Sequence, residues 1–235
     1  MRILLFFTLL FALCSVNLMY KHCYKEPAYK ELAKVNPNKP FIQNRPSTLQ
    51  ARASHMITIL TQDGTAHCTG TAIGPHAILT AEHCSPEKRV RFDYATETYN
   101  VLLQIKDNRE HIIFFIDGPP FTEIEPINLR APRIGEVTYF YGHGNKVYPA
   151  TAKMGIVLDE YDPSEIDARE GLFYISNLVL LGDSGAVVYG SDGDILGVVT
   201  YRLTDGMSDL ISHGGIFPLA FTRCQIKMAQ NYVHK

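Results

Sequence analysis

Residues 68–84 read Cys68-Thr-Gly-Thr-Ala-Ile-Gly-Pro-His-Ala-Ile-Leu-Thr-Ala-Glu-His83-Cys84. Two short apolar runs, Thr69–Ile73 and Ala77–Ala81, lie on either side of a Gly-Pro pair. Because glycine and proline are strong turn formers, this pattern predicts a strand, a turn and a second strand. The second predicted strand leads directly into His83 and Cys84, so His83 is the first candidate functional residue.

A second informative segment, Gly182-Asp-Ser-Gly185, follows about a hundred residues later. It predicts a tight turn that presents the hydroxyl of Ser184. A histidine that removes the proton of a serine hydroxyl turns a weak nucleophile into one that attacks acyl carbons. The tetrapeptide alone is a modest signal, since it also occurs in ordinary hairpin turns. Together with the histidine segment and its two cysteines, in this order, it is a strong one.

From His55 onward the chain consists mainly of short apolar runs separated by turn residues. Such spacing predicts an all-β barrel or sandwich. Only Cys224–His234 has a helical pattern. The predicted strand regions are Met56–Leu60, Thr69–Ile73, Ala77–Ala81, Val90–Tyr94, Tyr99–Ile105, Ile112–Ile116, Val137–Tyr141, Ala152–Leu158, Leu172–Ile175, Ala186–Tyr189, Ile195–Tyr201 and Ile216–Phe221.

The composition is that of an ordinary globular protein. The chain has 235 residues, of which 46% are hydrophobic, so one or two domains with a sizeable core are expected. The formal net charge is −2 and no basic run occurs, which argues against nucleic acid or an anionic membrane as the main partner. Neither Cys-x-x-Cys nor His-Glu-x-x-His is present, so we expect no metal and no cofactor.

These motifs resemble those of chymotrypsin-like (trypsin-fold) serine proteases. The segment after Ser184, including Ile195–Tyr201, is similar to the paired strands after the family's nucleophile, and Phe221-Thr-Arg223 resembles its closing Tyr-Thr-Arg. The resemblance covers roughly residues 54–232, and its order of base before serine fits this family. It implies an all-β fold of two six-stranded antiparallel β-barrels with a C-terminal helix and a catalytic cleft between the barrels. It also implies a disulfide between Cys68 and Cys84.

The resemblance assigns roles to the two motifs. Ser184 would attack the scissile carbonyl, and His83 would act as general base and then as general acid. The backbone N–H groups of Gly182 and Ser184 would form the oxyanion hole. Asp183 would turn inward and need a positive or hydrogen-bonding partner, which in the trypsin branch is an N-terminus released by cleavage. The segment at Arg52 is unlike a standard activation site, which favours activity without cleavage.

The third catalytic group is less clear from the sequence. In the family an aspartate just before an apolar strand orients the histidine, but none directly precedes Ile112–Ile116. Glu110 is closest in register and is favoured, because its longer stem carries the same charge toward the ring. Asp107 has the family's residue type but lies a few residues early, and Asp117 lies beyond the strand. We interpret His111 as an ordinary histidine and not as a second base.

The substrate pocket is expected to include Leu178, Thr200 and Arg202, from their places relative to the serine and the strand after it. Leu178 stands six residues before Ser184, where an aspartate would imply a preference for Lys or Arg. Trypsin-like basic specificity is therefore not expected. Arg202 stands where the family often has a glycine, so it would narrow the pocket or attract an acidic side chain, unless it faces solvent.

The N-terminus predicts a secretory signal peptide over residues 1–17. Arg2 precedes the apolar run Ile3–Leu13, and small or polar residues follow. An uncleaved membrane anchor is an alternative, and so is lipidation at Cys14, although Leu13 fits that motif poorly. Residues 18–53 contain prolines among lysines and predict an extension that wraps the domain, or a propeptide, before a protease domain at residues 54–235.

Removal of the signal peptide leaves four cysteines, a number that favours export to an oxidising compartment. With Cys68 and Cys84 joined as the resemblance implies, Cys23 and Cys224 are predicted to pair and to tie the extension to the C-terminal helix. We therefore expect a secreted protein, extracellular or periplasmic, with no stable membrane partner unless the N-terminal segment stays uncleaved.

The sequence thus predicts a secreted, monomeric serine endopeptidase that acts on proteins or peptides. The alternative is a catalytically impaired relative that uses the same cleft as a binding module, an interpretation supported by the displaced carboxylate. A third hypothesis is an exported β-protein with chance motifs, which would place Ser184 far from His83.

Overall fold

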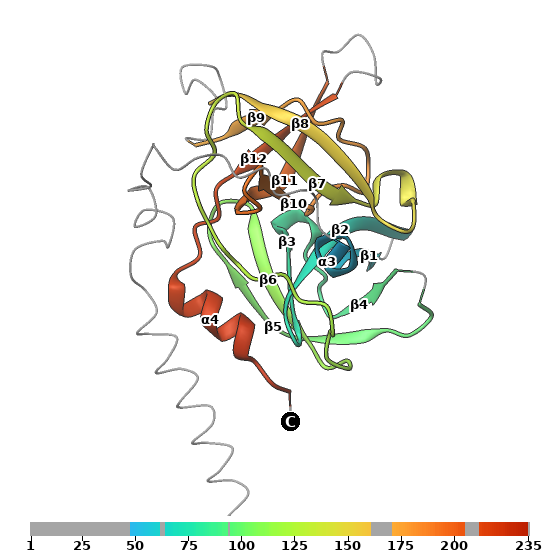
Figure 1. Ribbon diagram of the computed structural model, residues 1–235. Coiled ribbons are helices and arrows are strands. Elements are labelled where there is room, and N and C mark those ends of the chain that lie inside the picture. Colours follow the sequence, from blue (N-terminus) through green and yellow to red (C-terminus); the bar gives the residue numbers. More distant parts are fainter. Residues whose placement is uncertain (1–47, 62–63, 94, 161–170, 205–211, 235) are drawn as a thin grey trace, which may run out of the picture.

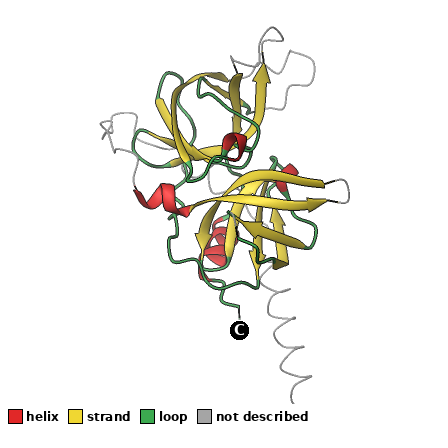
Figure 2. Cartoon of the chain, turned by 90° about the vertical axis from the view of Figure 1, so that its right-hand side faces the viewer, coloured by secondary structure: helices red, strands yellow, loops and turns green. Residues whose placement is uncertain are grey.

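The computed structural model describes residues 48–61, 64–93, 95–160, 171–204 and 212–234. The predicted signal peptide and most of the predicted extension lie outside these residues. The described chain forms two closed antiparallel β-barrels of six strands each, one above the other (Figures 1 and 2). The predicted fold class is therefore confirmed. Within the described residues, no helix is long and apolar enough to cross a membrane.

The first barrel contains the histidine segment. Its strands follow the order β1-β2-β3-β6-β5-β4, and β1 closes the barrel by pairing with β4. The bounds are β1 Ser54–Thr61, β2 Gly64–Gly74, β3 Ala77–Ala81, β4 Arg89–Phe92, β5 Tyr99–Lys106 and β6 His111–Ile116.

The second barrel contains the serine segment and repeats the same strand order, β7-β8-β9-β12-β11-β10, closed by pairing of β10 with β7. In each barrel the two outermost strands of this order pair with each other, so no strand edge of the sheet is left free. The bounds are β7 Val137–Gly142, β8 Thr151–Glu160, β9 Phe173–Ile175, β10 Val187–Gly190, β11 Ile195–Thr204 and β12 Ser212–Phe217.

Each predicted apolar run overlaps one of these strands, but the last run is displaced. The prediction placed it at Ile216–Phe221, whereas β12 begins at Ser212 and ends at Phe217. Pro218 lacks the N–H group that a strand needs, so the strand stops before it. The small residues Gly214 and Gly215 pair with both β11 and β9, although they have no apolar side chain to signal a strand.

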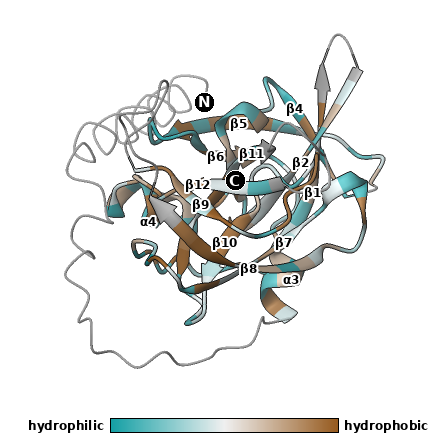
Figure 3. Ribbon diagram, turned by 90° about the horizontal axis from the view of Figure 1, so that it is seen from above, coloured by the Kyte–Doolittle hydropathy of each residue, from teal (hydrophilic) through white to brown (hydrophobic). Residues whose placement is uncertain are grey.

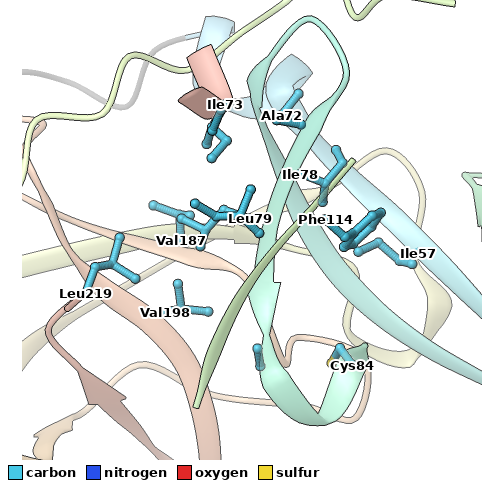
Figure 4. Packing of buried hydrophobic residues seen from close by; sticks show 14 of the residues in the cluster. Ile57, Ala72, Ile73, Ile78, Leu79, Cys84, Phe114, Val187, Val198 and Leu219 are labelled. Carbon is cyan, nitrogen blue, oxygen red and sulfur yellow. The ribbon is translucent and has the colours of Figure 1, made fainter. Parts of the chain in front are cut away.

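The core lies inside each barrel and continues between them. Leu79 of β3 and Phe114 of β6 are fully buried, and they belong to one cluster with Val187 of β10 and Val198 of β11 (Figure 4). Burial of a side chain of this size contributes about 1.5–3 kcal/mol. Apolar residues are concentrated on strands such as β10, all of whose residues are buried (Figure 3). The shared cluster holds the two barrels together and so fixes the residues at their junction.

Two short helices flank the barrels. The C-terminal helix α4, Arg223–Asn231, was predicted over Cys224–His234 and begins with a capping box between Thr222 and Gln225. It packs back onto β2 of the first barrel, so close to Gly74 that a Cβ there would lie 2.0 Å from the Ala229 carbonyl oxygen. The helix α3, Thr48–Ala53, precedes β1 and contacts β1 and β2.

Candidate active site

His83 lies at the end of β3, in the 3₁₀ turn η1 formed by Glu82–Cys84. The position of this turn is fixed on two sides. A disulfide joins Cys84 to Cys68 on β2, as the resemblance implied. The Glu82 N–H donates to the Glu110 carbonyl at 2.7 Å, which extends the pairing of β3 with β6 by one residue. His83 is thereby held at the edge of the first barrel, where the residue is accessible to solvent although part of it is buried.

Ser184 lies in the tight turn between β9 and β10 of the second barrel, and it is partly exposed. The Thr69 N–H on β2 donates to the Ser184 carbonyl at 2.8 Å, across the junction of the barrels. The sulfur of Cys84, next to His83 in the chain, lies 3.7 Å from the same carbonyl oxygen. The fold therefore brings the His83 and Ser184 segments together at the junction.

The turn before Ser184 leaves the N–H groups of Gly182 and Ser184 without an acceptor among the described residues. The Asp183 N–H donates to the Leu180 carbonyl at 3.0 Å, and Gly182 at the third turn position has φ of +103°. Glycine is the residue that adopts this conformation at little cost. Among the described residues, neither the Gly182 N–H nor the Ser184 N–H has an acceptor. Two free donors this close together suit an oxyanion.

The His83 ring makes no hydrogen bond to Ser184 or to any other described side chain. Contacts of this kind often tighten only when substrate binds. Partial burial lowers the pKa of His83 below its ordinary value of 6.5, while the charge of Glu110 acts in the opposite direction. The lowered pKa favours the neutral ring, which is the form that can accept a proton.

Glu110 is the carboxylate whose charge acts on His83. It is half-buried and lies in the turn before β6, with a left-handed backbone at φ of +68°. Such a backbone is uncommon for a residue other than glycine. The strand register places it opposite Glu82, one residue from the histidine.

Asp107 has a different set of partners. Its carboxylate is buried and lies 2.6 Å from Nδ1 of His111, and it accepts from the N–H groups of Arg109, His111 and Ala220. Burial raises the pKa of Asp107, but the His111 ring and the backbone donors outweigh it and hold the pKa below the ordinary range. None of its contacts within the described residues involves His83. The geometry therefore does not support the prediction that Asp107 orients the base, and His111 is a fully buried histidine.

Asp183 turns inward, as the resemblance implied, and is fully buried. Its carboxylate accepts from the N–H groups of Gly144 at 2.8 Å and Leu180 at 2.7 Å. It also forms an ion pair with the ammonium group of Lys153 on β8. Sequence reasoning identified the need for a positive partner but missed Lys153. The only signal in the sequence was a lysine within the predicted strand Ala152–Leu158.

The three predicted pocket residues differ in their exposure and contacts. Leu178 is 44% exposed, and the Thr200 hydroxyl is buried and donates to the Val198 carbonyl. Arg202 is half-buried and pairs with Gly214 across β11 and β12. Their predicted role in substrate selection stays a prediction.

Two further sequence-based predictions concern cysteines and metals. Cys224 is disulfide-bonded, but its predicted partner Cys23 lies outside the described residues, so that pairing stays a prediction. In the described part of the chain, no three His, Cys, Asp or Glu side chains are grouped so that they could hold a metal ion.

Comparison with known proteins agrees with this architecture. The sequence model of the Trypsin family matches residues 42–112, which include His83 and Glu110. A search of curated protein sequences found no match.

Several solved structures have a similar fold at low sequence identity. An inactive form of the Rv3671c protease of M. tuberculosis is 17% identical with a TM-score of 0.55, over 86% of this chain and 94% of that one. A serine endoprotease from Yersinia pestis is 18% identical with a TM-score of 0.52, over 74% and 64% of the two chains. The HtrA-type protease AlgW, solved as a serine-to-alanine variant with a tripeptide, is 14% identical with a TM-score of 0.59. The match covers 73% of this chain and 57% of that one. The paired barrels, the Trypsin match and these neighbours together give this chain the fold of a chymotrypsin-like serine protease.

Proposed function

We propose that this protein is a secreted serine endopeptidase that cleaves peptide bonds through an acyl-enzyme on Ser184. The observation that carries the proposal is the meeting of three features at the barrel junction. These are the His83 turn, the accessible Ser184 hydroxyl, and the free N–H groups of Gly182 and Ser184. Together they supply a base, a nucleophile and an oxyanion site, the parts that acyl transfer requires.

In the first half of the reaction, His83 removes the proton of the Ser184 hydroxyl as its oxygen attacks the scissile carbonyl. The carbonyl oxygen becomes negative and accepts hydrogen bonds from the N–H groups of Gly182 and Ser184. Each such donor contributes about 3–4 kcal/mol to the transition state. The protonated His83 then gives its proton to the leaving amine. A water molecule, deprotonated by His83, hydrolyses the ester in the second half, and Glu110 stabilises the charged ring in both.

Export is part of the proposal. The Cys68–Cys84 disulfide suits an oxidising compartment, and residues 1–17 have the pattern of a signal peptide. The non-catalytic alternative is not favoured, because the chain has a candidate base in His83, a candidate nucleophile in Ser184, and two N–H groups with no acceptor among the described residues.

A fluorophosphonate probe tests the proposed function directly. We expect the probe to label the wild-type protein at Ser184, as identified by peptide mapping with mass spectrometry. The His83→Ala variant should label far more slowly, because the hydroxyl then lacks its base. Labelling that is absent from the folded wild-type protein, or that is independent of His83, would contradict the proposal.

The pH dependence of kcat/KM follows from the state of His83. Only the neutral ring can accept a proton, so activity should be lost as the pH falls through the pKa of His83. Because partial burial lowers that pKa, the half-maximal point should lie below pH 6.5. A pH profile of kcat/KM measures it. An acidic midpoint above pH 6.5 would contradict the assignment.

A further inference from the structure

We propose that Lys153 is a positioning residue that supplies, from within the chain, the positive charge that orders the oxyanion hole. The uncleaved chain would then be an active peptidase without an N-terminus released by proteolysis. This inference rests on the proposed function, and it adds which residue keeps the oxyanion hole in its active conformation.

The ion pair between Lys153 and Asp183 is almost entirely shielded from water. The Asp183 side chain is 0% exposed and the Lys153 side chain is 12% exposed. The ammonium also lies 5.5 Å from the centre of the buried Phe140 ring, a favourable position for a cation. A carboxylate buried this deeply needs a compensating positive charge, and Lys153 provides it.

Asp183 connects this charge to the catalytic turn. It lies between Gly182 and Ser184, whose N–H groups form the proposed oxyanion site. Its carboxylate accepts from the Leu180 N–H at the start of the same turn and from the Gly144 N–H of the neighbouring loop. The inward carboxylate thus holds the turn that contains Gly182 and Ser184.

The neighbouring loop is shaped around the ion pair. A Cβ on Gly144 would lie 2.7 Å from Nζ of Lys153 and 2.8 Å from Oδ2 of Asp183. A Cβ on Gly142 would lie 2.2 Å from Oδ1 of the same carboxylate. Real Cβ contacts are not this short, so any side chain on either glycine would disturb the pair.

The residues around the start of β1 are packed against the domain, and Asp183 has its partners without an N-terminus released by cleavage. Ala53 is fully buried at the end of α3, and the Ser54 hydroxyl donates to the Tyr141 carbonyl at 3.0 Å. Arg52, in the segment that is unlike a standard activation site, is paired with Glu123 at 3.2 Å. The carboxylate that would receive a released N-terminus already has three partners.

The test compares labelling by a fluorophosphonate in five forms of the purified protein, the wild type and four variants, each checked by intact mass to be uncleaved around residue 52. We expect the wild type and Arg52→Gln to label at the same rate. Lys153→Met should label at least about 100-fold more slowly, the loss typical when an oxyanion donor is misplaced. Lys153→Arg, which keeps the charge, should recover most of the rate. Lys227→Met, an exposed lysine of α4, is the matched control and should behave as the wild type.

Steady-state kinetics separates positioning from a general loss of structure. Because an oxyanion hole binds the transition state and not the ground state, Lys153→Met should lower kcat much more than it raises KM. Circular dichroism and thermal unfolding establish that the variant is folded. If it is not folded, the crystal structure of the uncleaved wild-type adduct decides instead, and it should show Lys153 on Asp183.

Three results would overturn the inference. One is labelling of folded Lys153→Met at the rate of the wild-type protein. Another is labelling of the wild type only after a cut before β1. The third is an adduct structure in which a new N-terminus, and not Lys153, contacts Asp183. If no form is labelled, cut or uncut, the proposed function itself fails, and that outcome is distinct from the other three.

Discussion

Ser184→Ala is expected to lower kcat about 10⁶-fold, as loss of the nucleophile does when serine and histidine act as a unit. The variant keeps the binding surface and both N–H donors, so KM should change little. The substitution removes one partly exposed hydroxyl with no hydrogen bond to another described side chain, so stability should be nearly unchanged. Single-turnover and steady-state kinetics on a peptide substrate measure the loss.

Two further variants make this prediction specific. The double variant, which carries both Ser184→Ala and His83→Ala, should be at most about tenfold slower than either single variant. The reason is that the base has no role without its nucleophile. Ser191→Ala is the matched control. Ser191 is a buried serine whose hydroxyl has no partner among the described residues, and it lies outside the site. Losses that multiply in the double variant, or activity that survives Ser184→Ala, would show that the two residues do not act together.

Glu110→Gln is expected to lower kcat about 10⁴-fold, the loss seen when the acid of a catalytic triad becomes an amide. The amide keeps the shape of the side chain but cannot stabilise the charged His83 ring. Since the Glu110 charge raises the pKa of His83, its removal should also move the acidic limb of the kcat/KM profile to lower pH. Both effects are read from one set of pH profiles.

Asp107→Asn distinguishes the two candidate carboxylates. Asp107 holds His111 and the backbone at Ala220, so its loss should lower the free energy of unfolding by about 1–3 kcal/mol. Turnover of the folded variant should stay within a few-fold of the wild type. If Asp107→Asn abolishes turnover and Glu110→Gln does not, the roles given to the two residues are reversed.

Much of the fold could be predicted because its signals are local. Turn residues around short apolar runs marked each strand region, and the structure contains the Cys68–Cys84 disulfide that the family resemblance implied. The start of β12 was missed because Gly214 and Gly215 form the strand by pairing on both sides. Strand pairing of that kind leaves no apolar pattern in the sequence.

The site was predicted where motifs define it and missed where the tertiary structure does. His83, Ser184 and Gly182 were proposed as site residues from their motifs, and the structure brings their segments to the junction of the barrels. On β8 the alternation misleads, because the apolar Met154 and Ile156 are exposed while Lys153 between Ala152 and Met154 points toward Asp183. A lysine on a strand would ordinarily be assigned to solvent. Its role depends on a partner thirty residues away, which no local pattern reveals.

The most direct test of the account is a crystal structure of the wild-type protein after reaction with a fluorophosphonate. We predict a bond from the Ser184 oxygen to phosphorus, a phosphoryl oxygen that accepts from the N–H groups of Gly182 and Ser184, and the His83 ring within hydrogen-bonding distance of the adduct. An adduct on another residue, or on Ser184 with its oxygen outside that turn and the His83 ring out of reach, would contradict the account.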